Sequence, residues 1–244
     1  MSKKANYYSD KVVYKPWGYE YVVFNNSNRL AITFLKINHG HKTSLHCHPK
    51  KKTGFIILSG KASVQIGIYK RNKKNYRSLS RLMFRAGLFH SIKAISKKGV
   101  CALEFETPFI KNDLVRFKDD YGRQSKPYEG KKFTQTVKSS FLKFKKPKLG
   151  KKQKYKFSNL DISLEVKKNL QKLATKDDMT ACAILDGKVV DNTGQNVISY
   201  GEIVKSSTLK ILTDVFTVRK PLTILRVSKR NVKKSTNVRF ELIN

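Results

Sequence analysis

The sequence has no long apolar run, few cysteines and few acidic residues, and each scarcity excludes a class of protein. No apolar run among its 244 residues approaches the roughly 18–20 that cross a bilayer. The first residues, MSKKANYYSDKVVY, are basic but lack the apolar stretch of a secretory signal. We therefore expect a cytoplasmic protein without a membrane span.

The three cysteines, Cys47, Cys101 and Cys182, are odd in number and widely spaced. This pattern fits neither a disulfide framework nor a zinc site built on Cys-x-x-Cys pairs. It agrees with a reducing compartment.

Acidic residues number 17 against 52 lysines and arginines, which gives a net charge of +35. Such a charge favours polyanions. However, lysine strongly outnumbers arginine and is spread along the whole chain, whereas proteins that read nucleic acids rely on arginine forks and stacking aromatics. We therefore expect a small anionic substrate and no nucleic-acid partner.

Short apolar segments dominate the sequence, and they predict β-strands. They are rich in β-branched and aromatic residues and are separated by turn-forming residues at regular intervals. Examples are YEYVVF (19–24), AITFLKI (31–37), GFIILSG (54–60), ASVQIGI (62–68) and VCALEFE (100–106). Many short strands with even spacing indicate an all-β sandwich or small barrel.

The later part of the chain predicts a linker followed by more strands. Residues 111–130 are polar and predict a short helix or turn and a loop, and the lysine-rich segment that follows predicts a linker or an extended crossing segment. Strands are predicted at 154–166, 209–218 and 222–227, a hairpin at 181–204 with its turn at 191–194, and a short helix at 165–176.

The histidines carry the strongest functional signal. His46 and His48 are separated by one residue, so on a strand both side chains point to the same face. Two imidazoles placed in this way can occupy neighbouring positions on one divalent metal. His90, which follows a glycine turn, could complete the site from another strand. His39 and His41 are interpreted as exposed loop residues.

These residues resemble the cupin motifs. Gly40, His46, His48 and Gly60 match the first motif, and the stretch from Gly87 to His90 resembles the second. The resemblance covers roughly residues 12–125, and it implies a jelly-roll barrel with Zn, Fe or Mn bound by His46, His48 and His90. Thr53 stands where the family usually has a glutamate ligand, which leaves at most three histidine ligands.

Two flanking segments resemble one branch of the cupins. Lys15-Pro16-Trp17-Gly18-Tyr19-Glu20 and residues 43–48 are similar to the sugar-phosphate cupins, including type II mannose-6-phosphate isomerases. Residues 50–55 depart from that family, so mannose 6-phosphate itself is not the expected substrate. The resemblance implies an isomerase or epimerase acting on a sugar phosphate or nucleotide sugar in surface-polysaccharide biosynthesis.

The expected substrate-binding residues are Lys52, Arg116 and Arg123. The two arginines would lie on a helix at the barrel mouth and bind phosphate as bidentate forks. The alternative is a structural helix whose arginines pair with Asp113, Asp119 and Asp120. Lys52, Tyr69 and Tyr121 are candidates for moving a proton, and the sequence does not choose between them.

The expected organisation is a cupin domain at 1–130, a basic linker at 131–153 and a degenerate second cupin-like β domain at 154–244. A homodimer is an expectation from fold analogy alone. Two other functions stay open: a three-histidine non-haem iron dioxygenase, and a non-catalytic cupin that binds a sugar or a partner protein. Elemental analysis and replacement of His46 and His48 would separate them.

Overall fold

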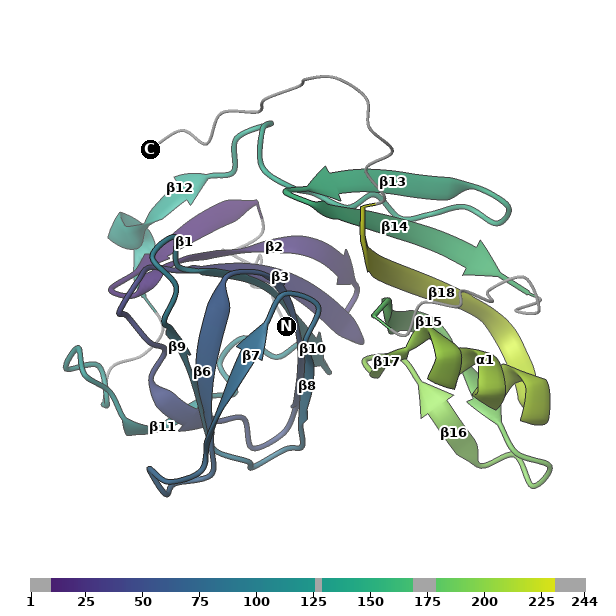
Figure 1. Cartoon of the computed structure of the whole chain (residues 1–244), viewed down its shortest axis with the longest axis horizontal. Coiled ribbons are helices and arrows are strands. Elements are labelled where there is room, and N and C mark those ends of the chain that lie inside the picture. The colour runs from purple at the N-terminus through teal and green to yellow at the C-terminus, as the bar shows by residue number, and fades with distance from the viewer. Residues whose placement is uncertain (1–9, 126–128, 169–178, 231–244) are drawn as a thin grey trace, which may run out of the picture.

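The computed structural model describes residues 10–125, 129–168 and 179–230. These residues form four layers: a five-stranded sheet, a seven-stranded sheet, a six-stranded sheet and a helix. In Figure 1 the first two sheets make up the purple to teal body, and the third sheet and the helix lie beside it in green and yellow. The predicted all-β architecture is confirmed.

The seven-stranded sheet is the central layer, with strands in the order β12-β1-β2-β3-β10-β5-β8. Its neighbouring strands are antiparallel. The strands are β1 (Lys11–Lys15), β2 (Gly18–Asn26), β3 (Leu30–Ile37), β5 (Lys52–Ser59), β8 (Arg81–Phe84), β10 (Val100–Thr107) and β12 (Thr134–Thr136).

The five-stranded sheet faces one side of the central sheet, and its order is β11-β4-β9-β6-β7. It consists of β4 (Leu45–Cys47), β6 (Lys61–Ile66), β7 (Lys73–Arg77), β9 (His90–Ala94) and β11 (Val115–Lys118). Side chains from both sheets, including Leu35, Phe55, Val64 and Ile92, form one buried cluster between them. Two facing antiparallel sheets around such a core are the predicted jelly-roll barrel.

The six-stranded sheet packs on the opposite side of the central sheet. It contains β13 (Lys152–Phe157), β14 (Leu160–Lys167), β15 (Ala181–Val190), β16 (Asn196–Ser199), β17 (Ile203–Lys205) and β18 (Thr217–Lys229). Phe34, Leu103 and Phe105 of the central sheet share a buried cluster with Leu164 and Leu225 of this sheet. The barrel and the C-terminal sheet are therefore joined by a continuous hydrophobic core.

Helix α1 (Ser206–Val215) covers the far face of the C-terminal sheet. Its Leu209 is fully buried in a cluster with Cys182, Ile184 and Ile224. The prediction of a strand at 209–218 is wrong for most of this segment. Leu209 and Leu212 are one turn apart, so a helix can place both on the sheet.

A glycine permits the close approach of the C-terminal sheet to the barrel. A Cβ at Gly54 in β5 would lie 2.7 Å from Cδ1 of Ile203 in β17 and 2.7 Å from Sδ of Met83 in β8. Because Cβ atoms do not tolerate such distances, a larger residue at position 54 would push β17 away from the barrel.

The lysine-rich segment between the two parts lies across the barrel as an extended connection. After the short 3-10 helix Lys131–Phe133, β12 pairs with β1. Farther on, Phe144 is buried, and its N–H donates to the carbonyl of Val23 at 2.8 Å. This segment therefore contributes to the core as well as linking the two parts.

For residues 111–130 the prediction was a short helix or turn followed by a loop. The described residues of this segment have turns at 111–112 and 120–121 and no helix, and Val115–Lys118 forms strand β11, which was not predicted. This segment pairs with β4 and thereby gains inter-strand hydrogen bonds that an isolated helical turn would lack. The predicted turn at 191–194 is confirmed, and the Asp191 carboxylate accepts the backbone N–H groups of Thr193 and Gln195. Most of the helix predicted at 165–176 lies outside the described residues, and its first three residues belong to β14.

The C-terminal part differs from the barrel in its layering. Its described strands form one sheet packed between the barrel and a helix, whereas the jelly roll has two facing sheets. The chain length allows two cupin-like halves, and the boundaries at 130 and 153 stay predictions.

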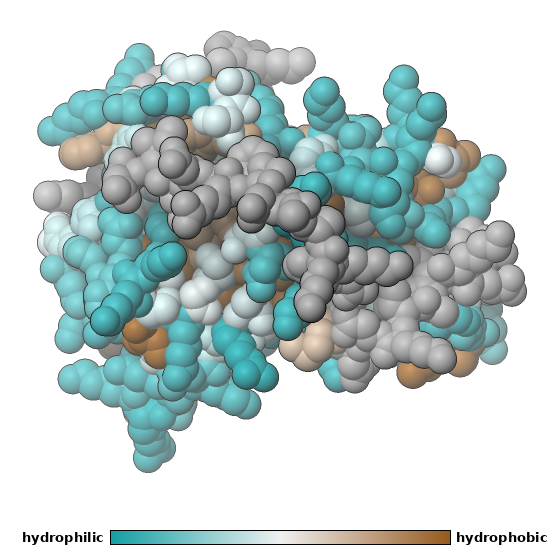
Figure 2. All heavy atoms as spheres, turned by 45° about the horizontal axis from the view of Figure 1, so that its top comes forward, coloured by the Kyte–Doolittle hydropathy of each residue, from teal (hydrophilic) through white to brown (hydrophobic). Residues whose placement is uncertain are grey.

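The three cysteines are buried and none forms a disulfide. Hydrophilic side chains cover much of the described surface in the face shown in Figure 2. In the described ranges, no helix combines the length and the apolar character required to cross a membrane.

Candidate metal centre

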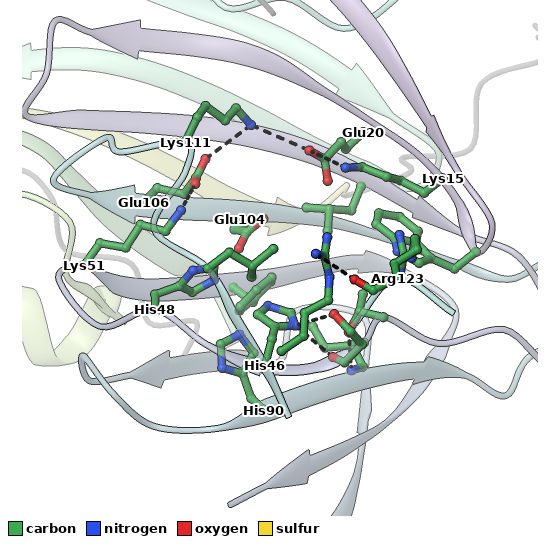
Figure 3. Close-up of a pocket in the computed structure, with 18 residues that line it drawn as sticks. Lys15, Glu20, His46, His48, Lys51, His90, Glu104, Glu106, Lys111 and Arg123 are labelled. Atoms are coloured by element: carbon green, nitrogen blue, oxygen red, sulfur yellow. Dashed lines mark hydrogen bonds and ion pairs between the residues drawn. The ribbon is translucent and has the colours of Figure 1, made fainter. Parts of the chain in front are cut away.

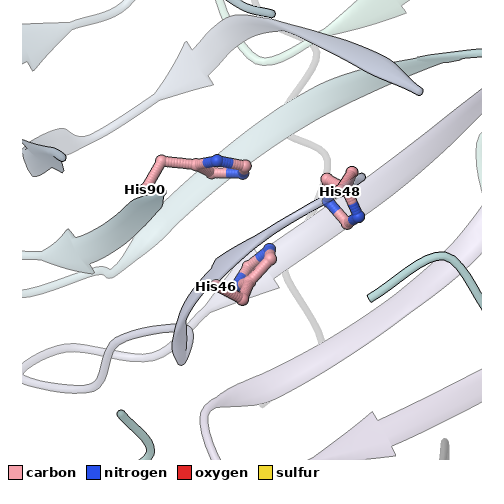
Figure 4. A group of neighbouring side chains, drawn as sticks. All are labelled: His46, His48 and His90. Carbon is pink, nitrogen blue, oxygen red and sulfur yellow. The ribbon is translucent and has the colours of Figure 1, made fainter. Parts of the chain in front are cut away.

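Three histidines converge on the inner side of the five-stranded sheet (Figure 4). His46 lies in the middle of β4 and is the cross-strand partner of His90, the first residue of β9. His48 follows β4 directly, so the alternation of the strand points it to the same side as His46. One potential ligand atom from each ring lies within 4.8 Å of the others.

Each imidazole is oriented by a backbone carbonyl. The Nδ1 atom of His46 lies 2.8 Å from the carbonyl oxygen of Ser44, that of His48 lies 2.5 Å from Asp113, and that of His90 lies 3.0 Å from Leu88. A carbonyl accepts only, so each Nδ1 must carry the proton, and the lone pair of a neutral ring is on Nε2.

The Nε2 atoms of His48 and His90 are buried and have no hydrogen-bond partner among the described residues. A buried polar atom without a partner is costly in a folded protein. A metal ion bound at Nε2 would remove this cost, and hydrogen bonding of the opposite ring nitrogen is the usual arrangement of metal-ligating histidines.

The surroundings keep the three rings neutral. Burial is the largest cause, and it lowers the pKa of His48 to about 3 and that of His90 to about 4. The pKa of His46 is also lowered, first by burial and then by the neighbouring rings of His90 and His48. Neutral imidazoles are the form that binds metal.

The donor set therefore fits a divalent metal. Three neutral nitrogen ligands suit Zn²⁺ or Fe²⁺ and leave further positions for water or substrate. Thr53, in the slot that usually holds glutamate, is buried, and its hydroxyl has no hydrogen-bond partner within the described part of the chain. It does not line the cavity in front of the histidines. Among the described residues, no fourth side chain of a ligating type joins the group.

The loop that follows His48 is fastened by Asp113. Besides accepting from His48, Asp113 uses its carboxylate to accept the backbone N–H groups of Lys50 and Lys51 at 2.9 Å. This contact fixes the direction in which Lys51 leaves the loop.

The histidines lie in a cavity between the two sheets of the barrel (Figure 3). The empty space in and in front of this cavity is about 660 Å³, a volume that includes open solvent. Trp17, Leu35 and Phe55 provide apolar wall, and the remaining lining includes eight charged side chains: Lys15, Glu20, Lys51, Glu104, Glu106, Lys111, Arg116 and Arg123.

Alternating charges run along one wall of this cavity, as the dashed lines in Figure 3 show. Lys51 binds Glu106 at 2.5 Å, and Glu106 also faces Lys111 at 4.0 Å. Lys111 lies 3.6 Å from Glu20, and Glu20 lies 3.7 Å from Lys15. Each charge is compensated by its neighbours, so this wall can remain ionised although it is buried.

Glu104 and Glu106 face the same cavity but differ in charge state. Burial alone would raise the pKa of Glu106, yet attraction to Lys51 and Lys111 lowers it overall. For Glu104, burial and then the charge of Glu106 raise the pKa well above its usual range. One carboxyl group is thus held ionised while its neighbour favours the protonated form.

The residues expected to bind substrate are placed differently from one another. Arg116 and Arg123 both line the cavity, whereas Lys52 points out of the barrel and lies 3.4 Å from Glu202. The adjacent Lys51 occupies the inward position instead.

Arg123 is already engaged by two carboxylates. Its guanidinium binds Asp119 and Glu129, each at 2.7 Å. Of the carboxylates named in the structural alternative, Asp119 does pair with Arg123, whereas Asp113 instead contacts the loop after His48. Asp120 pairs with Lys42 at 2.7 Å.

The candidates for proton transfer lie outside the cavity lining. Tyr69 is exposed beside Arg71. The Tyr121 hydroxyl accepts the backbone N–H of Lys42 and contacts Nδ1 of His41. His39 and His41 are exposed, as expected for loop residues.

The sequence interpretation missed the acidic residues of the cavity, although a signal for them exists. Glu104 and Glu106 alternate with Leu103 and Phe105 in a strand that is otherwise apolar. Because side chains alternate between the faces of a strand, two charges spaced by two residues predict a polar inner face. Lys51 and Lys111 lie in loops, where no comparable pattern marks an inward-pointing lysine.

Residues 2–119 match the family model described as mannose-6-phosphate isomerase C-terminal. Over 117 residues the chain is 28% identical to the xanthan biosynthesis protein XanB of Xanthomonas campestris pv. campestris, in strain B100 and in strain ATCC 33913. This similarity covers 46% of the chain and 23% of XanB, so the chain spans about a quarter of the length of these relatives.

Solved structures that resemble the chain include KdgF from Halomonas sp., with 15% identity, a TM-score of 0.36, and coverage of 43% of this chain and 94% of KdgF. The capsular polysaccharide assembling protein CapF from Staphylococcus aureus gives 14% identity, a TM-score of 0.39, and coverage of 44% and 34%. Similarities of this size do not inform function. The N-terminal half of this chain is thus similar to the mannose-6-phosphate isomerase C-terminal domains, and its two facing sheets form a cupin-type barrel.

Proposed function

We propose that the chain is a metal-dependent enzyme that isomerises or epimerises a sugar phosphate or nucleotide sugar. The arrangement of His46, His48 and His90 carries this proposal: three neutral rings have Nδ1 bound to backbone carbonyls, and two Nε2 atoms are buried without a partner. A divalent metal bound there would act as a Lewis acid that polarises a sugar carbonyl.

The charge of the cavity supports an anionic substrate. Five basic side chains line it against three acidic ones: Lys15, Lys51, Lys111, Arg116 and Arg123 against Glu20, Glu104 and Glu106. The substrate would displace water from the space between the charged wall and the histidines. Water exclusion strengthens the attraction between a phosphate and these cations. Trp17 and Phe55 would contact the uncharged faces of the sugar.

Metal analysis tests the site independently of any substrate. The comparison is between the wild type, His48→Ala, His90→Ala, and His41→Ala as a matched control with an exposed ring. We expect about one divalent ion per chain in the wild type and the control. Loss of a ligand's hydrogen-bond partner lowers metal affinity by roughly 10- to 100-fold. His48→Ala and His90→Ala remove a ligand itself, so their affinity for the metal should fall by more than that. Equal metal content in all four proteins would contradict the site.

Catalysis is tested with the metal-loaded protein on a panel of sugar phosphates and nucleotide sugars, followed by NMR in D₂O. Deuterium incorporation or conversion of one member, dependent on His48 and His90, is the expected result. No conversion and no exchange with Zn²⁺, Fe²⁺ or Mn²⁺ would overturn the proposed activity.

A three-histidine oxygenase is the second candidate, because Thr53 provides no carboxylate ligand at the usual position. Iron in the purified protein together with oxygen uptake would favour it. Retention of sugar binding and of the cellular phenotype in a His46→Ser and His48→Ser double variant would instead favour a non-catalytic cupin. The role in polysaccharide biosynthesis, the homodimer and the cytoplasmic location stay predictions.

A further inference from the structure

The most basic part of the chain lies outside the barrel cavity. Residues 143–156, KFKKPKLGKKQKYK, contain eight lysines and no acidic residue, and we call them the lysine segment. All eight lysines are exposed: Lys143, Lys145, Lys146, Lys148, Lys151, Lys152, Lys154 and Lys156. None of them lines the cavity in front of the histidines, so the proposed sugar function does not explain this concentration of charge.

Aromatic residues fix the lysine segment to the body of the protein. Phe144 is buried, and its ring lies 5.0 Å from the ring of Tyr155, measured between centroids. The Tyr155 hydroxyl accepts the backbone N–H of Lys145 at 2.8 Å. Between these two ends, the Lys151 N–H donates to the Lys148 carbonyl at 3.0 Å and closes a turn. The lysines are therefore presented by a loop with a defined shape.

Strand β13 directs three of the lysines to one face. Lys152, Lys154 and Lys156 are exposed, whereas Gln153 and Tyr155 between them are half-buried. Because residues two apart on a strand are separated by roughly 6.5–7 Å, the three ammonium groups form a row. This row follows the edge of the C-terminal sheet. In Figure 1, β13 lies on the same side of the molecule as β12 and away from β6 and β7.

Most of this charge is not compensated by carboxylates. Within the described part of the chain, one lysine of the segment pairs with Asp10 and the other seven form no ion pair. The carboxylates on the neighbouring strand β14 are engaged elsewhere, Asp161 with Arg230 and Glu165 with Lys167. The lysine segment is therefore a region of strongly positive potential that favours an extended anionic partner.

Two features favour an anionic membrane surface over a nucleic acid as this partner. The segment contains no arginine, the residue whose planar fork suits nucleic-acid phosphates, whereas a layer of anionic headgroups attracts lysines as point charges. Leu149, in the turn between Lys148 and Lys151, is 55% exposed. An aliphatic side chain offers a base no aromatic face for stacking, but it can enter the boundary between headgroups and acyl chains.

We propose that residues 143–156 dock the protein on an anionic lipid surface, with the lysines contacting headgroups and Leu149 entering the interface. Such binding is reversible and requires no membrane span, because it depends on electrostatic attraction and on a small apolar area. The inference is independent of the proposed sugar chemistry, because other residues build the barrel cavity.

The experiment measures co-sedimentation of the full chain with phosphatidylcholine vesicles, with and without about 30% phosphatidylserine, over a range of salt concentrations. A single-stranded DNA oligonucleotide is titrated in parallel as the alternative polyanion. One variant neutralises four lysines of the segment: Lys145→Gln, Lys148→Gln, Lys151→Gln and Lys154→Gln. A matched control neutralises four exposed lysines of the β6–β7 hairpin and of the loop before β10: Lys70→Gln, Lys73→Gln, Lys74→Gln and Lys97→Gln.

We expect the wild type to bind vesicles that contain phosphatidylserine far more tightly than phosphatidylcholine alone, and to dissociate as the salt concentration rises. One lysine near an anionic surface contributes roughly fivefold in affinity, so the variant in the segment should lose more than about 100-fold. The control has the same net charge and should lose less than about tenfold. All three proteins should have the same melting temperature, because the substituted side chains are exposed.

Leu149→Trp tests the depth of insertion. Trp17 is the chain's only tryptophan and is buried, so a change of emission on addition of vesicles reports on position 149. We expect a shift to shorter wavelength with phosphatidylserine vesicles and none with phosphatidylcholine alone. An unchanged emission spectrum while the protein is bound to vesicles would show that Leu149 does not enter the interface.

Two outcomes would overturn the docking surface itself. Equal losses of affinity in the two four-lysine variants would show that net charge, and not this segment, determines binding. Binding of the oligonucleotide without binding of phosphatidylserine vesicles would replace the lipid by a nucleic acid. Neither outcome bears on the sugar activity, which is measured without vesicles and depends on the histidines of the cavity.

Discussion

The two faces of the central sheet bury their side chains against very different neighbours. On β10, Leu103 and Phe105 point outward into the core shared with the C-terminal sheet, whereas Glu104 and Glu106 point inward to the cavity. The same alternation separates Lys51, which is inside, from Lys52, which is outside. One strand thus joins two parts of the molecule on one face and builds a polar site on the other.

The difference shows that burial alone does not identify the role of a residue. Glu106 and Phe105 are both almost fully buried, but Phe105 stabilises the fold by removing apolar surface from water. Glu106 contributes only while its lysines remain, because a buried charge is tolerated only when paired. Substitutions on the two faces should therefore destabilise the protein for different reasons. The four substitutions below are ordered by their expected effect on stability.

Phe105→Ala should produce the largest loss, because it opens a cavity in the core between the barrel and the C-terminal sheet. We expect the free energy of unfolding to fall by about 3–5 kcal/mol in urea denaturation. Phe133→Ala, at a side chain that is 45% exposed, is the control and should change it little. A loss below about 1 kcal/mol at Phe105 would contradict a shared core.

Lys51→Met tests the inner face. It leaves Glu106 buried with Lys111 as its remaining cation, at 4.0 Å. The expected cost is about 3 kcal/mol, because removal of one partner strands the other charge. Urea denaturation measures it, and the double variant Lys51→Met, Glu106→Gln should recover much of the loss. If the double variant is no more stable than Lys51→Met, the pairing is not the cause.

Asp119→Asn tests the pair at the cavity mouth through its pH dependence. Burial would raise the pKa of Asp119, but hydrogen bonds from the Arg123 side chain and backbone lower it overall. A lowered folded-state pKa means that Asp119 stabilises the fold above its ordinary pKa, and that this contribution disappears as the pH falls through the folded-state pKa.

At pH 7 we expect Asp119→Asn to lower the free energy of unfolding by about 1–2 kcal/mol. The loss is no larger because nearby solvent weakens the ion pair. The difference from the wild type should shrink as the pH falls below about 4, because Asp119 takes up a proton in the unfolded chain first and in the folded protein only at lower pH. Unfolding curves at several pH values measure this difference. A difference that stays constant from pH 7 to pH 3 would show that charge is not involved.

Lys52→Met should have the smallest effect. Its ion pair with Glu202 is partly exposed, with 31% and 36% of the two side chains accessible. Such pairs contribute less than about 1 kcal/mol. The comparison with Lys51→Met is the sharpest test of the two faces, because the two lysines are neighbours in the chain. Equal losses of stability in the two variants would contradict the opposite placement.

The sequence was informative where a pattern repeats along a strand. The period of two in the apolar segments predicts the strands and the all-β barrel, and the spacing of His46 and His48 predicts that their rings share a face. It was less informative at residues 111–125 and 206–215. There, strand β11 forms because β4 offers an edge, and helix α1 forms where it can cover the C-terminal sheet.

The sequence by itself determined the barrel strands and the histidines that share one face of these strands. This was possible because side-chain alternation is a local property of an extended chain. Only the tertiary structure decided which charges meet those histidines. Lys51, Glu106, Lys111 and Glu20 come from four separate segments, and their pairing depends on how two sheets close around one cavity. The same closure places Glu104 in the cavity lining with the histidines and without an ion pair to any other described residue, a placement that depends on distances in space and not along the chain.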